Sequence, residues 1–298
     1  GEALGEECRK EDVAVLLGPG VNMKRSPLCG RNFEYFSEDP LLAGELAAAF
    51  IDGVQSRGVG TSLKHFAANS QEKARMVTDS VVDERALREI YLKPFEIAVK
   101  KAQPWTVMTA YNKLNGTYCS ENARLLTDIL RREWGFAGLT MTDWGAMNDP
   151  VESYRAGLDL QMPGPSGGND KILCQAVENG KLSPDALDAA AARVLELLLK
   201  AEEGKKVPYE CDMDAHLELA REAAEDGAVL LKNNGVLPGK PGQNVAVIGA
   251  FAKQPRYQGS GSSRINPTAL DNACEAFTAA GCEYVYAPGY SLTDNDVH

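Results

Sequence analysis

A carboxylate follows the apolar segment "GLTMTDW" (138–144), at the point where a predicted strand leaves the core. This residue, Asp143, is followed directly by the indole of Trp144. Aspartate is a preferred helix N-cap, and loops that lead from a strand into a helix often end with one. A strand-end carboxylate with an aromatic ring beside it also suits catalysis. The residues around Asp143 leave both interpretations open.

Polar side chains also gather at the carboxyl ends of the other predicted strands. They are Asn22, the pairs Lys64–His65 and Tyr111–Asn112, and Gln161. Ligands bind at this end of the strands in (β/α) barrels and in open parallel α/β sheets. A lone lysine is more often solvated and a lone histidine more often structural. Lys64 and His65 are adjacent and point to opposite faces of a regular strand, but both can reach one pocket where the chain turns.

Strand-like and helical segments alternate through the first two thirds of the chain, and this order implies parallel βαβ units. A barrel closes with eight strands in about 250 residues, so the five counted here predict an incomplete (β/α) TIM-like barrel over residues 1–203. Three local signals accompany the helices: Ser37 as an N-cap, Pro94 as a kink or break, and Gly135 as a stop. The predicted strands are 13–20, 60–69, 105–116, 138–144 and 157–164, and the predicted helices are 37–58, 83–102, 123–135, 169–179 and 184–203.

A second α/β unit is predicted after a charged linker that we place at residues 204–222. Residues 223–298 then contain the end of a helix, a short strand, a turn at Asn233–Asn234–Gly235 and a buried strand at 244–252. A small-residue loop at 258–268, a helix and another strand follow. We interpret this unit as the start of a larger α/β domain.

The composition excludes several classes of function. The net charge of −11 argues against nucleic acid as a partner, and no apolar run is long enough for a membrane span. Three histidines scattered along the chain argue against a zinc site. Seven cysteines without a CxxC pair suggest reduced thiols, and hence a cytoplasmic protein. The chain begins with Gly1 and has no signal segment, and we expect that its N-terminus is missing.

Six sequence blocks in order carry a specific resemblance that covers nearly the whole chain. They are "LGPGVNMKRSPLCGRNFEYFSEDP", "SLKHFAAN", "MTAYNKLNG", "MTDWGA", "LLKNNGVLP" and "GSGSSRINPT". Together they resemble the β-glucosidase branch of the family-3 glycoside hydrolases. The resemblance implies a barrel-like domain joined to an α/β sandwich domain, with the active site between them.

The resemblance also implies roles for individual residues. Asp143 matches the nucleophile of a retaining glycosidase, which works with an acid/base carboxyl about 5–5.5 Å away. Substrate-binding roles fall on the following residues: Arg31, Lys64 and His65 as donors to sugar hydroxyls, Tyr111 as a phenol that hydrogen-bonds the nucleophile and lowers its pKa, Trp144 as a stacking surface, and Met108 as a wall. Core packing is an alternative for Trp144 and Met108, and Lys24 and Arg25 could pair with nearby carboxylates instead.

Two parts of the family's active site have no match in this sequence. The resemblance places an aspartate that grips sugar hydroxyls upstream of Gly1, and it places the acid/base glutamate beyond His298. A related branch, the N-acetylglucosaminidases, uses a histidine on the loop after the "KHF" block. Here that loop, "AANSQEKARMVTDS" (67–80), contains no histidine. We therefore expect an internal portion of a larger enzyme, completed by a second polypeptide or by further segments.

The resulting prediction is a retaining β-glucosidase that hydrolyses terminal non-reducing β-D-glucosyl residues of β-glucosides or oligosaccharides, with the acid/base glutamate supplied from outside this segment. No metal or organic cofactor is implied, and self-association into a homo-oligomer is left open. The first alternative is a non-catalytic sugar-binding fragment or subunit. A remoter alternative is an aldolase in which Lys64 forms a Schiff base with a carbonyl substrate.

Overall fold

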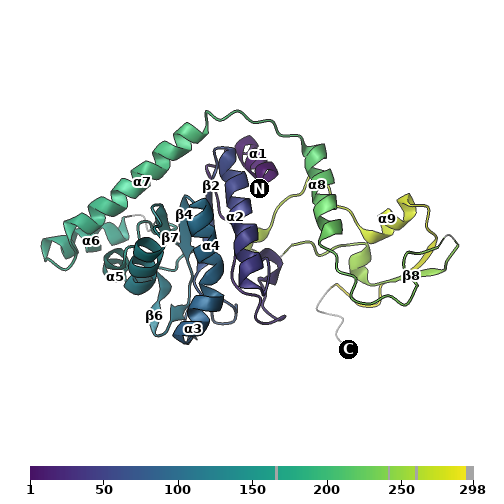
Figure 1. Ribbon diagram of the computed structural model, residues 1–298, viewed down its shortest axis with the longest axis horizontal. Helices are drawn as coiled ribbons and strands as arrows, with labels where there is room; N and C mark the ends of the chain where they lie inside the picture. The colour runs from purple at the N-terminus through teal and green to yellow at the C-terminus, as the bar shows by residue number, and fades with distance from the viewer. Residues whose placement is uncertain (165–166, 241, 259–260, 293–298) are drawn as a thin grey trace. The chain divides into compact units, whose positions relative to one another are not determined.

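The computed structural model describes residues 1–164, 167–240, 242–258 and 261–292, and they form two compact units (Figure 1). The first unit is Gly1–His216 and the second is Leu217–His298. None of the helices in the described residues is both long enough and apolar enough to cross a membrane.

A four-stranded parallel sheet organises the first unit. Its strands lie in the order β1 (Val15–Leu16), β2 (Gly60–Phe66), β4 (Thr106–Thr109) and β7 (Leu139–Thr142). All three neighbouring pairs are parallel, so the carboxyl ends of the four strands lie at one edge of the sheet. The alternation of strands and helices along the chain therefore produces the βαβ units that the sequence predicts.

The fifth predicted strand, at 157–164, is wrong. Only one isolated bridge, between Leu160 and Met141, joins this segment to β7. The backbone N–H of Thr140, which a further strand would bind through a carbonyl, donates instead to the carboxylate of Asp159 at 2.8 Å. The amides of Asp159 and Leu160 both donate to the Thr140 carbonyl oxygen. A side chain therefore replaces part of the ladder at this edge of β7.

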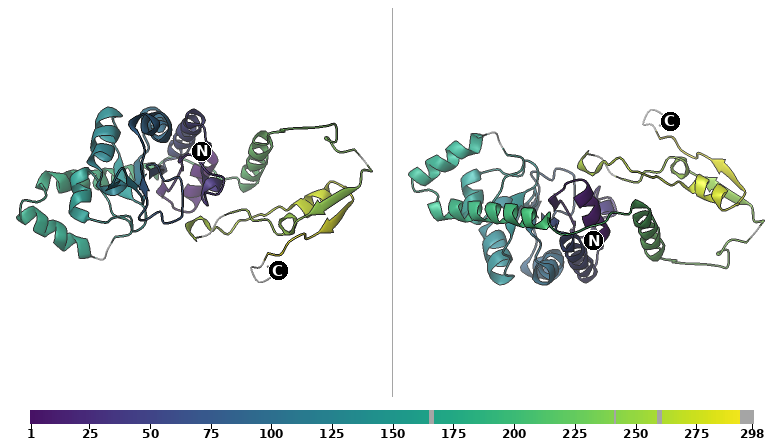
Figure 2. Two further views of the ribbon diagram at one scale, coloured as in Figure 1. Left: turned by 90° about the horizontal axis from the view of Figure 1, so that it is seen from below. Right: turned by 90° about the horizontal axis from the view of Figure 1, so that it is seen from above.

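Two long helices, α2 (Pro40–Ser56) and α4 (Lys93–Ala102), pack against each other beside the sheet, and they lie side by side in Figures 1 and 2. The N-cap of α2 is Asp39, whose Oδ1 accepts from the amides of Leu41 and Leu42. The prediction that Ser37 caps this helix is wrong, because Ser37 lies two residues before the N-cap and its hydroxyl accepts from the Asp39 amide. Pro40, which has no N–H to leave unpaired, starts the first turn.

The predicted helix over 83–102 is broken, as the position of Pro94 indicates. It divides into α3 (Glu84–Ala86), the π-helix η2 (Leu87–Tyr91) and α4, with Pro94 in the first turn of α4. The predicted helix over 123–135 is a π-helix, η4 (Arg124–Glu133). Gly135 follows it with a φ of +73°, a left-handed conformation that glycine adopts at no steric cost.

The main core of the first unit lies where the sheet meets these helices. The ring of Phe66 on β2 lies 5.1 Å from that of Phe95 on α4 and 5.8 Å from that of Trp134 after η4, measured between centroids. The remaining elements of this unit are α1 (Glu2–Lys10), η1 (Asn32–Glu34), η3 (Cys119–Glu121), α5 (Pro150–Ala156), α6 (Gly168–Glu178), α7 (Pro184–Gly204) and a small sheet of β3 (Asp79–Ser80), β5 (Lys113–Leu114) and β6 (Thr117–Tyr118). The βαβ order and parallel sheet confirm an α/β fold containing part of a TIM-like barrel.

The second unit contains a strand, a helix and a strand in the predicted order, but the strand expected to be buried at 244–252 is limited to residues 245–248, of which only Val247 is buried. Strands β8 (Val245–Ile248) and β9 (Tyr284–Ala287) pair in parallel, and α9 (Ala273–Ala279) lies between them in the chain. The short 3-10 turns η5 (Ala250–Ala252) and η6 (Gly261–Ser263) precede α9, and residues 259–260 of the small-residue loop lie outside the described residues.

The connection between the two units is helical. The helix α8 (Met213–Asp226) contains residue 222, the predicted end of the linker. The predicted domain limits stay a prediction. The described residues between α8 and β8 contain no strand, so the short strand expected there is wrong. The turn at Asn233 is confirmed, because its side-chain oxygen accepts from the amide of Gly235.

Candidate active site

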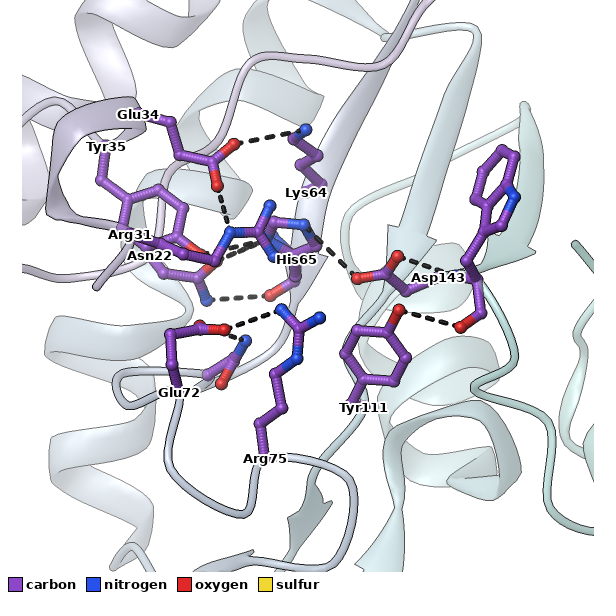
Figure 3. Close-up of polar contacts among 12 residues, drawn as sticks. Asn22, Arg31, Glu34, Tyr35, Lys64, His65, Glu72, Arg75, Tyr111 and Asp143 are labelled. Atoms are coloured by element: carbon purple, nitrogen blue, oxygen red, sulfur yellow. Dashed lines mark hydrogen bonds and ion pairs between the residues drawn. The ribbon is translucent and has the colours of Figure 1, made fainter. Parts of the chain in front are cut away.

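The carboxylate of Asp143 lies at the carboxyl end of β7 with its two oxygens in different situations (Figure 3). Oδ1 accepts a hydrogen bond from the backbone N–H of Trp144 at 2.7 Å. Oδ2 is buried, and no donor among the described residues makes a hydrogen bond to it. Nε2 of His65 lies 3.6 Å from it. One oxygen is thus fixed by the backbone, while the other is buried near His65 without a hydrogen bond.

The interpretation of Asp143 as a helix N-cap is wrong. The next helix, α5, begins at Pro150, and its N-cap is Asp149. Oδ1 of Asp149 accepts from the amides of Val151 and Glu152, at 2.8 and 3.0 Å. Because Asp149 already caps α5, Asp143 has no such structural role, and the burial of its Oδ2 without a hydrogen bond needs another explanation.

His65 is held from three sides at the carboxyl end of β2. The side-chain amide of Asn22 accepts from the backbone N–H of His65 and donates to its carbonyl, at 2.8 and 2.9 Å. The hydroxyl of Tyr35 lies 3.2 Å from Nδ1. Burial, followed by the charges of Arg31, Lys64 and Arg75, lowers the pKa of His65 well below its usual 6.5. His65 is therefore neutral at pH 7 and can offer a hydrogen bond without adding a charge.

Glu34 joins the two predicted sugar-binding cations. Its carboxylate accepts from Nε of Arg31 and lies 3.4 Å from Nζ of Lys64. All three side chains are largely buried, and burial lowers the pKa of Lys64, while Glu34 opposes that shift. The sequence analysis did not select Glu34, although its i,i+3 spacing from Arg31 in "GRNFE" is the signal that could have found it. Lys64 and His65 both reach the pocket, as predicted for a chain that turns there.

Tyr111 lies beside Asp143, and its hydroxyl makes a hydrogen bond to the neighbouring backbone. The hydroxyl donates to the carbonyl oxygen of Trp144 at 2.8 Å, whereas the sequence analysis assigned it to the carboxylate. Burial and then the charge of Asp143 raise the pKa of Tyr111 to about 12. The phenol therefore stays protonated, and it positions the backbone next to Asp143.

Trp144 and Met108 occupy different environments. The side chain of Trp144 is 44 % exposed, so the core-packing alternative is wrong for it. Met108 is buried in an apolar cluster with Leu139 and Met141, and its role as a pocket wall stays a prediction. The side-chain oxygen of Gln161 accepts a hydrogen bond from the side-chain amide of Asn169 at 2.7 Å.

The loop after β2 contributes residues that the sequence analysis missed. Nη1 of Arg75 donates to Oε2 of Glu72 at 2.7 Å, and the guanidinium carbon lies 4.4 Å from the ring centroid of Tyr111. Within the part of the chain that the structure describes, no three His, Cys, Asp or Glu side chains group closely enough to hold a metal ion. The site thus combines one unpaired carboxylate, a neutral imidazole and several cations, an arrangement suited to a polyhydroxylated ligand that reacts with a carboxylate.

Comparison with known families gives one match over most of the first unit. A sequence profile described as "Glycosyl hydrolase family 3 N terminal domain" matches residues 1–197. Among curated proteins, the chain is 58 % identical to the thermostable beta-glucosidase B of Acetivibrio thermocellus, over 100 % of this chain and 40 % of that protein. It is 50 % identical to an exo-alpha-(1->6)-L-arabinopyranosidase of Bifidobacterium breve, over 98 % of this chain and 40 % of that protein.

Solved structures give the same result. A GH3 beta-glucosidase of Bifidobacterium adolescentis superposes with a TM-score of 0.91 at 48 % identity, covering 98 % of this chain and 43 % of that one. Beta-glucosidase 3B of Thermotoga neapolitana, solved in complex with glucose, superposes with a TM-score of 0.89 at 46 % identity, covering 95 % and 41 %. The chain thus spans about 40 % of the length of the curated relatives named here.

Proposed function

This chain belongs to glycosyl hydrolase family 3, and from that premise we propose that it carries the nucleophile and part of the glycone pocket of a retaining β-glucosidase. One observation supports this above the others: the buried carboxylate of Asp143 has one oxygen fixed by the Trp144 amide and the other unpaired. A nucleophile needs an oxygen that no donor occupies and that is held in one orientation.

The proposed chemistry has two steps. Oδ2 of Asp143 attacks the anomeric carbon, the bond to the leaving-group oxygen breaks, and a glucosyl ester of Asp143 forms. The leaving oxygen takes a proton from an acid. A water molecule then attacks the same carbon, gives a proton to that group, and releases glucose and the carboxylate. Two inversions at one carbon leave its configuration unchanged.

The acid/base group is proposed to lie outside this segment. Two other carboxylates lie near the pocket, Glu34 and Glu72 (Figure 3). Glu34 is engaged by Arg31 and Lys64, and Glu72 by Arg75. Neither is free to face a leaving group, so we assign protonation to a glutamate supplied by a further segment or by a second polypeptide.

The proposed role of the two cations, Arg31 and Lys64, is to bind the hydroxyl groups of the sugar. Arg31 and Lys64 can donate charge-assisted hydrogen bonds to hydroxyls, and Glu34 holds both in place when no sugar is bound. The aldolase alternative has little support, because the ammonium that would form a Schiff base is paired with Glu34. Trp144, with its exposed indole beside the nucleophile, offers a face on which a ring can stack.

The proposed substrates are β-glucosides or oligosaccharides with a terminal non-reducing glucose. The Acetivibrio thermocellus relative is named a beta-glucosidase, whereas the Bifidobacterium breve relative is named an exo-alpha-(1->6)-L-arabinopyranosidase. The specificity test is therefore a panel of nitrophenyl glycosides that contains β-D-glucoside, β-D-xyloside and α-L-arabinopyranoside. It is carried out with the longer polypeptide or assembly that contains this chain.

Retention of configuration tests the proposed reaction directly. Proton NMR of a fresh reaction with an aryl β-glucoside should show the β-anomer of glucose first, and the α-anomer only as mutarotation proceeds. Initial release of the α-anomer would contradict a covalent intermediate. Sugar binding without turnover, in the complete assembly, would favour a non-catalytic sugar-binding protein.

Loss of either cation should weaken binding of the glycone. For Lys64→Ala and Arg31→Ala, we expect the binding free energy of a glucose-like inhibitor, measured by calorimetry, to become less favourable by about 1.5–3 kcal/mol in each variant. This is the usual contribution of a hydrogen bond to a charged group. The matched controls are Lys100→Ala and Arg124→Ala, which remove exposed ion-paired cations elsewhere and should leave the affinity unchanged. Wild-type affinity in both pocket variants would place the glycone site elsewhere.

A further inference from the structure

We propose that Arg75 is a positioning residue for Asp143: it fixes the ring of Tyr111, and Tyr111 fixes the backbone that orients the carboxylate. This inference rests on the proposed function, because it concerns the alignment of the nucleophile. Arg75 belongs to the loop between β2 and β3, and Figure 3 shows its side chain beside Tyr111.

The guanidinium of Arg75 is placed by two contacts. On one side its carbon lies 4.4 Å from the centroid of the Tyr111 ring, within the range of a cation–π interaction. On the other side, Nη1 pairs with Glu72 at 2.7 Å. Glu72 also lies 3.4 Å from the side-chain amide of Asn69. Because Glu72 holds the guanidinium in place, the planar guanidinium of Arg75 can pack on the Tyr111 ring and limit its rotation.

The loop is tied to the strand end that carries Tyr111. Strand β3 follows the loop and pairs with β5, which begins two residues after Tyr111. The amide of Lys113 donates to the carbonyl oxygen of Thr78 at 2.9 Å. The small sheet therefore ties the end of the loop that carries Arg75 to the segment that follows Tyr111.

The path from Tyr111 to the nucleophile consists of two hydrogen bonds. The hydroxyl of Tyr111 donates to the Trp144 carbonyl oxygen at 2.8 Å, and the Trp144 amide donates to Oδ1 of Asp143 at 2.7 Å. A tilt of the ring would release the carbonyl and allow the backbone around Trp144 to rotate. No hydrogen bond or ion pair joins the Arg75 side chain to Asp143 among the described residues, so the proposed influence of Arg75 on the carboxylate passes through Tyr111.

Coupling between two substitutions tests this role. Arg75→Gln should lower kcat for a nitrophenyl β-glucoside about tenfold, within the range expected for loss of a partly buried cation–π contact, with KM changed less than about twofold. Arg75→Lys keeps a cation over the ring and should recover most of this loss. In a Tyr111→Phe background, from which the hydroxyl is already absent, Arg75→Gln should lower kcat by less than about twofold further.

The control variant is Arg85→Gln, which removes an exposed arginine paired with Glu89 and should leave kcat and KM unchanged. Circular dichroism and inhibitor binding by calorimetry should match the wild type in Arg75→Gln, which separates misplacement of the nucleophile from loss of the fold. Additive effects of Arg75→Gln and Tyr111→Phe would overturn the positioning role, as would a rise in KM at unchanged kcat, which indicates direct contact with substrate.

The Asp143→Ala variant separates the two proposals. If it is inactive while Arg75→Gln behaves as the wild type, the positioning role alone is overturned. If Asp143→Ala turns over normally, the proposed function fails, and the positioning role fails with it.

Discussion

Replacing Asp143 by alanine should abolish turnover of aryl β-glucosides, with a loss of kcat on the order of 10⁴-fold or more, because no other group can form the ester. A substrate with a good leaving group is the sharpest choice, since its cleavage depends little on the acid but still requires the nucleophile. The assay compares initial rates of nitrophenol release at saturating substrate, in the protein that contains this chain.

The matched control is Asp149→Ala, which removes a neighbouring carboxylate of known structural role. Loss of the N-cap of α5 should lower the stability by about 1 kcal/mol and leave kcat near the wild-type value. A wild-type rate in Asp143→Ala would contradict the assignment of Asp143 as the nucleophile. Equal losses of kcat in Asp143→Ala and Asp149→Ala would show that any disturbance of this loop inactivates the site.

The largest effect on stability is expected at Asp159. Its carboxylate is buried between Arg131 and Arg193, with N–O distances of 2.6 and 2.7 Å, and it also accepts from the Thr140 amide at the edge of β7. Asp159→Asn removes the charge and leaves two guanidiniums without their partner. We expect the free energy of unfolding to fall by about 3–5 kcal/mol, measured by urea denaturation followed through tryptophan fluorescence.

The control for this variant is Asp128→Asn, which removes an exposed carboxylate paired with Arg132 one turn along η4. A surface pair of this kind contributes about 0.5 kcal/mol or less, so the denaturation midpoint should scarcely move. If Asp159→Asn is as stable as Asp128→Asn, the buried network does not hold the 157–160 segment against β7.

Most of the parallel sheet and its order along the chain could be predicted from the sequence. Apolar runs such as 138–144 and the amphipathic segments between them carry strong periodic signals. The fifth strand could not be predicted correctly, because the side chain of Asp159 replaces part of its ladder, and an apolar run does not show which hydrogen bonds its backbone makes. The N-cap of α2 was misplaced by two residues, since both Ser37 and Asp39 are good caps and only the backbone geometry separates them.

The sequence likewise predicts some residues of the candidate site and misses others. Strand-end polar residues such as Asp143 and Lys64 follow from local sequence, because parallel strands bring their carboxyl ends together. Glu34, Glu72 and Arg75 could not be selected by that rule, since Glu34 lies in the short 3-10 helix η1 and the other two lie on the loop after β2, and the strand pattern places neither segment. The hydrogen bond from Tyr111 to the Trp144 carbonyl oxygen could not be foreseen, because this carbonyl and the Asp143 carboxylate belong to adjacent residues.

Trapping the glycosyl-enzyme ester tests the central claim most directly. An aryl glucoside with fluorine at C2 and a good leaving group forms the ester faster than water can remove it, because the electron-withdrawing fluorine slows hydrolysis. The protein is digested after inactivation, and the peptides are sequenced by mass spectrometry. The account predicts a single labelled peptide with the fluoroglucosyl group on Asp143, and no label in Asp143→Ala. A label on any other carboxylate, or rapid turnover without a label, would contradict it.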